Sequence, residues 1–91
     1  MKIDNIKNMV IQMLLYIDTI TVIGYDSTVS YGIKKQVLNN AILYTGYEEL
    51  DGLQSSVLID FGEIVNIVIK ETAINLYSKD GKVWSVIQAA Y

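Results

Sequence analysis

The sequence predicts a mainly α-helical domain of three helices, followed by a C-terminal strand or hairpin. Two observations support this fold class. The segment Leu53 to Tyr77 repeats its apolar residues with the period of an amphipathic helix. Two earlier segments show the same period behind residues that can act as N-caps, Asp4 and then Asp26 or Ser27. The chain is 52% hydrophobic, which is enough for a compact core.

The first predicted helix begins at the Asp4 cap and ends between Tyr16 and Thr19. Its apolar stripe consists of Ile6, Val10, Met13, Leu14 and Ile17. Residues 19–25 follow as a connector. They are β-prone and can form a short strand.

The second predicted helix begins after Asp26 or Ser27 and ends at Thr45-Gly46. Its apolar stripe consists of Val29, Ile33, Val37, Ala41 and Tyr44. Gly46 occupies the position after a helix that favours a left-handed conformation. Residues 47–52 (YEELDG) then form an acidic loop.

The third predicted helix covers Leu53 to Tyr77, with Asp51 as its N-cap and Gln54 completing a partial capping box. Its polar side is interrupted by a second apolar stripe, which indicates a second packing partner. That stripe consists of Ile59, Ile67 and Ile74, with Tyr77 close by. The alternative is an α+β fold with a C-terminal meander, because residues 64–69 (IVNIVI) are rich in β-branched side chains.

The C-terminal segment begins with a turn over residues 78–82, in which Gly81 supplies a positive φ. Residues 82–91 (KVWSVIQAAY) alternate and predict a strand or an extended tail. A hairpin with residues 73–77 is the competing interpretation. We treat residues 1–91 as one domain, with a helical core at 1–77 and a turn and tail at 78–91.

The composition excludes much of the usual catalytic chemistry. The chain has no Cys and no His, so Ser-His-Asp and Cys-His sites and the commonest metal ligands are missing. Its carboxylates do not follow an EF-hand pattern, and Asp60 with Glu63 is a weak pair for a hydrolase. We therefore expect no enzymatic activity, no cofactor and no metal.

The charge and hydropathy patterns limit the partners. A net charge of −3 and the absence of Arg argue against specific nucleic-acid binding. The apolar segment 9–25 is interrupted by Gln12 and Asp18, and an Asp near the centre of a membrane span costs about 2.5–3.5 kcal/mol. We expect no membrane insertion and a cytoplasmic location.

Two features suggest self-association: the second apolar stripe and the aromatic C-terminal tail. Aromatic residues are enriched at the cores of protein interfaces. The candidate interface residues are Ile59, Ile67, Ile74, Tyr77, Trp84 and Tyr91. A second layer of one small core explains the same residues, and the sequence leaves both interpretations open.

Residues 33–65 resemble the centre of the small helical head–tail connector (adaptor) proteins of tailed phages. The pattern is carried by Val37, Ala41 and Tyr44, then Glu49-Leu50 with Leu53, then the aliphatic run from Val57 to Tyr77. The chain departs from the family pattern where a Pro is expected. The resemblance implies a non-enzymatic virion protein, found in the virion or host cytoplasm, that forms a homo-oligomeric ring and docks on a portal or tail protein.

A second function remains open, that of a small acidic phage inhibitor. It would bind a host defence protein or a nucleic-acid-processing protein. Its contact residues would be Glu48, Glu49 and Asp51, whose carboxylates could mimic phosphates.

Overall fold

The fold is mostly β, with one short helix, and the prediction of a mainly α-helical domain is wrong. A computed structural model describes residues 3–89. The elements in chain order are α1 (Ile3–Tyr16), β1 (Thr19–Ile23), β2 (Thr28–Val29), β3 (Tyr31–Leu38), β4 (Ala41–Tyr47), β5 (Gln54–Asp60), β6 (Ile64–Ile69), β7 (Ala73–Ser78) and β8 (Val83–Gln88).

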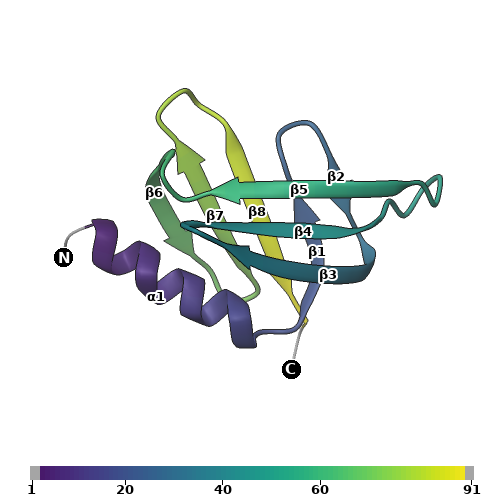
Figure 1. Cartoon of the computed structure of the whole chain (residues 1–91), viewed down its shortest axis with the longest axis horizontal. Coiled ribbons are helices and arrows are strands. Elements are labelled where there is room, and N and C mark those ends of the chain that lie inside the picture. The colour runs from purple at the N-terminus through teal and green to yellow at the C-terminus, as the bar shows by residue number, and fades with distance from the viewer. Residues whose placement is uncertain (1–2, 90–91) are drawn as a thin grey trace.

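The strands form two antiparallel sheets. The five-stranded sheet has the order β2-β1-β8-β7-β6, and the three-stranded sheet has the order β3-β4-β5. The chain passes from one sheet to the other at two corners, at Ser30 between β2 and β3 and at residues 61–63 between β5 and β6. Figure 1 shows the strands of the two sheets crossing at a large angle, with α1 beside them. This is the arrangement of an orthogonal sandwich whose corners are made by strands that change sheets.

The first helix is present, and it covers an open side of the sandwich. Asp4 lies in its first turn, and its apolar stripe buries Val10 and Leu14 completely. The last turn of α1 contains no basic residue. The Lys35 Nζ of β3 instead donates to the carbonyl oxygens of Leu14, at 2.6 Å, and Ile17, at 3.3 Å. A cation at this end of a helix is favoured by the helix dipole.

The second predicted helix does not form, and its residues build β2, β3 and β4. In β4 the burial alternates with period two: Ile42, Tyr44 and Gly46 face inward, and the residues between them are more exposed. Asn40 takes a φ of 58° in the tight turn between β3 and β4, which a helix interior does not allow. Gly46 is needed for a close approach, because a Cβ there would lie 2.6 Å from the Val29 Cγ1. The prediction that Gly46 ends a helix is therefore wrong.

The long helix predicted over Leu53 to Tyr77 is replaced by β5, β6 and β7. The Asp60 Oδ1 accepts a hydrogen bond from the Gly62 amide at 2.9 Å, which forms a turn inside the proposed helix. Asp51 likewise accepts from the Leu53 amide in a loop, at 2.9 Å, and does not cap a helix. The β-branched residues of 64–69 pair with β7, and β7 pairs with β8. The last pairing is the hairpin that competed with an extended tail, and Gly81 has the expected positive φ, 88°.

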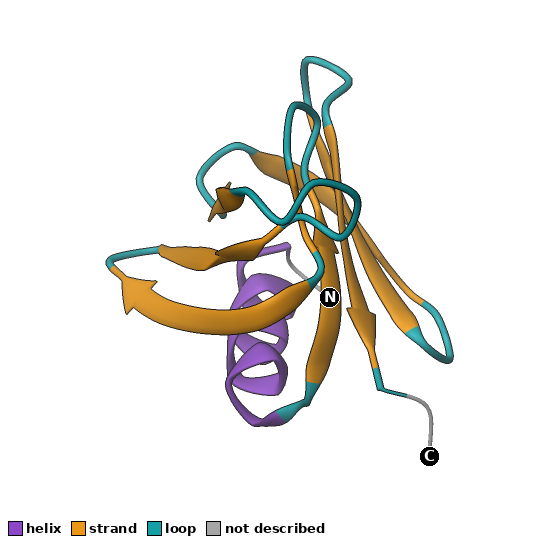
Figure 2. Ribbon diagram, turned by 90° about the vertical axis from the view of Figure 1, so that its right-hand side faces the viewer, coloured by secondary structure: helices purple, strands orange, loops and turns teal. Residues whose placement is uncertain are grey.

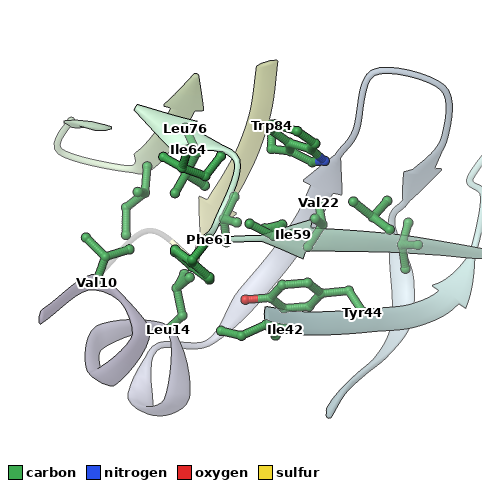
Figure 3. Close-up of a cluster of buried hydrophobic side chains, with 14 residues drawn as sticks. Val10, Leu14, Val22, Ile42, Tyr44, Ile59, Phe61, Ile64, Leu76 and Trp84 are labelled. Atoms are coloured by element: carbon green, nitrogen blue, oxygen red, sulfur yellow. The ribbon is translucent and has the colours of Figure 1, made fainter. Parts of the chain in front are cut away.

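One apolar core fills the space between the two sheets and α1. Figure 3 shows side chains from α1 and from both sheets converging there, with Phe61 near their centre. Phe61 belongs to the corner between β5 and β6 and has no exposed surface. Its amide donates to the Asn40 carbonyl at 3.0 Å, so the corner is tied to the β3–β4 turn.

Two hydroxyl groups are buried beside this core without a hydrogen-bond partner in the described structure, the Thr19 Oγ1 and the Tyr44 OH. They line a small cavity of about 210 Å³ near the C-terminal end of α1. Burial raises the pKa of Tyr44 from 10.0 to about 12, because the phenolate would lose its hydration.

The buried phenol predicts a pH dependence of stability. Since the pKa of Tyr44 is higher in the folded chain, its contribution is complete below pH 10 and is lost as the pH rises towards 12. Because of this shift, the free energy of unfolding of the unmodified chain should fall by about 1 kcal/mol between pH 9 and pH 11. Tyr44→Phe has no phenol to ionise and should not show this loss. Urea unfolding at both pH values measures it. Tyr31→Phe, at an exposed tyrosine, is the control. Equal losses in both variants would contradict the assignment.

Candidate functional site

The structure places most of the predicted interface residues inside the molecule. Ile59, Ile74 and Trp84 belong to the core and are at most 2% exposed. Ile67 also faces inward and packs against that core. Tyr77 lies on the outer side of β7, and Tyr91 lies outside the described residues. The second apolar stripe therefore consists largely of inward-facing strand residues. This agrees with the interpretation of these residues as part of one small core and not as a surface for self-association.

The carboxylates do not converge on a chemical site. Within residues 3–89, no group of three or more metal-ligating side chains is close enough to hold a metal ion. Glu48, Glu49 and Asp51 occupy the loop between β4 and β5, with Leu50 fully exposed among them. A shallow cavity of about 530 Å³ separates Leu50 and the two glutamates from residues 24–30.

A second polar group braces the turn between β7 and β8. The Lys82 Nζ lies 4.4 Å from the centre of the Tyr25 ring, and that ring meets Trp84 edge-on at 5.6 Å. The neighbouring Tyr25 and the Asp80 carboxylate raise the pKa of Lys82. A hydrogen bond from the Ser78 hydroxyl, with Lys82 nearby, lowers the pKa of Asp80. Because the Lys82 ammonium group already lies over the face of the Tyr25 ring, we interpret this cluster as one that stabilises the β7–β8 turn.

The outward face of the five-stranded sheet is a third candidate surface. Figure 2 shows α1 and the three-stranded sheet on the same side of this sheet, and its opposite side is bare. Strand register and alternation define the residues on the bare side. They are Thr21, Ile23, Thr28, Asn66, Val68, Ala73, Asn75, Tyr77, Val83, Ser85 and Ile87. We call this set the outward face.

None of these outward-face residues is charged, although 19% of the chain is. A solvated antiparallel face usually carries polar side chains opposite an apolar inner face. Here Ile23 and Val83 are each 40% exposed. The central polar pair is satisfied internally, because the Ser85 Oγ donates to the Asn75 Oδ1 at 2.7 Å.

Charged residues surround the outward face at both ends of its strands. Lys79, Asp80 and Lys82 lie at the β7–β8 turn, and Lys70 with Glu71 lies at the β6–β7 turn. An uncharged centre inside a charged rim is the usual anatomy of a protein interface. The outer side of the three-stranded sheet differs, because Lys34 and Asp60 lie on it. The sequence signal for the outward face was the alternation of uncharged residues in β7 and β8, which is visible only once the strands are known.

Substitutions of Ile74 and Tyr77 compare a core position with a surface position in the same strand, β7. Ile74→Ala should destabilise the fold by about 2–5 kcal/mol, because it leaves a cavity in the core. Tyr77→Ala should cost about 1 kcal/mol or less, because it removes only cross-strand contacts. The fluorescence of Trp84, the one tryptophan in the sequence, reports unfolding of both variants. Equal destabilisation would contradict this placement of β7.

Comparison with known proteins gives no relative. No protein-family model, no curated protein and no solved structure matches this chain. In residues 3–89, no helix has both the length and the apolar character that crossing a membrane requires.

Proposed function

We propose that this chain is a non-enzymatic subunit that binds a second copy of itself through the outward face of its five-stranded sheet. The observation that carries the proposal is the absence of charge across that face. The face mixes aliphatic residues with uncharged polar ones, and an uncharged patch inside a charged rim is typical of an association surface. The aliphatic groups that supply the contact are Ile23, Val68, Val83 and Ile87.

A second copy is the partner that fits the charge distribution best. Each chain carries a net charge of −3, so two copies repel each other over most of their surfaces. At the outward face neither copy brings a charge, and no buried ion is left without a partner. Two such faces can stack at the roughly 10 Å separation of a β-sandwich, related by a two-fold axis.

The size of the face limits the affinity. Four strands of five or six residues, each roughly 17–20 Å long and spaced about 4.8 Å apart, with the two-residue β2 at one edge, make a compact interface at the small end of specific complexes. For contact through this face alone we therefore expect a concentration-dependent equilibrium between monomer and dimer.

The connector resemblance adds little support to this proposal. It rested on apolar spacing in helices, and the residues concerned, 33–65, are strands and turns. The acidic loop supports an inhibitor function less well than the outward face supports association. Glu49 and Asp51 are exposed, and within residues 3–89 the three carboxylates belong to no metal-binding cluster.

Placing a charge on the outward face tests the proposal. Ile23→Lys introduces an ammonium group that has no partner in the stacked pair. It also makes the net charge of −3 less negative, so the general repulsion between two copies does not increase. We expect the face-to-face association to weaken at least about 100-fold, measured by sedimentation over a range of concentrations.

Leu58→Lys is the matched control. Leu58 is 49% exposed and lies on the outer side of the three-stranded sheet, so its substitution should leave the association unchanged. Trp84 fluorescence verifies that both variants are folded. If Ile23→Lys associates like the unmodified chain, the outward face is not the contact surface.

A further inference from the structure

The open edges of the two sheets differ in how they are protected. An exposed sheet edge can pair with another chain, and proteins usually prevent this with short strands, bulges or charges. β2 has only two residues. The β3 edge carries Lys34 and Lys35, and its register shifts between Tyr31 and Lys34. The free side of β5 is approached by the Ser27 hydroxyl, which donates to the Ser56 carbonyl at 2.8 Å.

β6 has six residues, carries no charge and is regular after its first residues, which makes it the exception among the sheet edges in residues 3–89. Its sequence, IVNIVI, contains no charge, no Pro and no Gly, and it pairs only with β7. Val65 is 51% exposed and Ile69 is 45% exposed. Figure 1 places β6 at the end of its sheet, away from β1 and β2. Its register irregularity is confined to the start of the strand, between Ile64 and Asn66.

The backbone groups of Ile67 and Ile69 point away from β7. The Lys70 amide donates to the Ala73 carbonyl at 2.8 Å, which fixes the hydrogen-bonded pairs of this hairpin. By alternation, Val68 also bonds to β7, while Ile67 and Ile69 lie in non-hydrogen-bonded pairs. The Ile67 amide donates instead to the Asn66 Oδ1, at 3.0 Å. That contact independently shows that the Ile67 amide lies outside the ladder with β7.

We infer that β6 is a second association site, which pairs in antiparallel fashion with β6 of another copy of this chain. A two-fold axis at Val68 places Ile67 of each copy opposite Ile69 of the other copy. Both residues direct their amide and carbonyl groups outward, so each pair can exchange two hydrogen bonds once the Ile67 amide gives up its bond to the Asn66 Oδ1. The regular part of the strand, after the irregularity near Val65, supplies all of these contacts.

Another copy suits this edge because the pairing opposes no like charges. In the same register Lys70 lies opposite Asn66 and Glu71 lies opposite Val65 of the second copy. Like charges in opposition are what usually prevent such self-pairing. In the paired sheets the outward faces of the two copies lie on the same side, with Lys70 of each copy opposite Asn66 of the other at the junction. The edge and the face use different atoms, so a chain with both sites forms assemblies larger than a dimer.

Ile69→Pro tests the inference directly. It removes an amide that points outward and is not used by β7, and Pro is tolerated at such edge positions. Ile69→Ala is the matched control, because it shortens the same side chain but keeps the amide. We expect Ile69→Pro to weaken edge pairing at least about tenfold more than Ile69→Ala, measured by sedimentation of variants that Trp84 fluorescence shows to be folded.

Combining this change with Ile23→Lys separates the edge from the face. We expect the unmodified chain to exceed a dimer, each single variant to stop at a dimer, and the double variant to be monomeric. If Ile23→Lys alone is monomeric, the edge inference is overturned and the proposed face remains. If Ile69→Pro alone is monomeric and Ile23→Lys has no effect, the edge remains and the proposed face is overturned. If Ile69→Pro and Ile69→Ala behave alike, the free amide is not used and the edge inference fails.

Discussion

The two sheets depend on the corner at Phe61, where the chain leaves β5 and enters β6. The Phe61 ring is fully buried between α1 and both sheets, and its amide is bonded to the β3–β4 turn. In a chain of 91 residues one core must serve both sheets, because a domain of this size has little apolar surface to spare. The corner places the inward residues of β5 and of β6 against the same core.

This shared core determines which surfaces remain free. The inner side of the five-stranded sheet is covered by α1 and by the three-stranded sheet, and no element within residues 3–89 covers its outer side (Figure 2). The outward face and the β6 edge are both parts of this uncovered sheet. Within residues 3–89 this uncharged surface is uncovered, and the two proposals of association follow from that one arrangement.

The sequence was sufficient to predict α1 and the turn after Tyr77, and it left β1 open as a β-prone connector and β8 open as a strand or extended tail. In α1 the helical period fits the apolar residues, although Asp4 lies inside the first turn and is not the cap, and Gly81 has the positive φ expected of the turn. It was not sufficient for residues 26–77. There the outward residues Leu58, Val65 and Val68 are as apolar as the inward ones, so the alternation of the strands is concealed.

The outward face could not be predicted from the sequence, because the strand alternation that defines it was not recognised. A helical wheel with two apolar sides suggested a second contact surface, but Ile59 and Ile74 turned out to be core residues of different strands. Tyr77 is the predicted interface residue that lies on the outward face. The rest of that face comes from strands that are distant in the sequence, and their pairing depends on long-range contacts that no local pattern contains.

Methyl NMR over a series of protein concentrations tests the central claim most directly. If the outward face is covered by a second copy, the methyl signals of Ile23, Val83 and Ile87 shift as the concentration rises, while those of the core residues Ile42 and Ile59 stay constant. Outward-face signals that do not change over a range in which the chain associates would contradict the account.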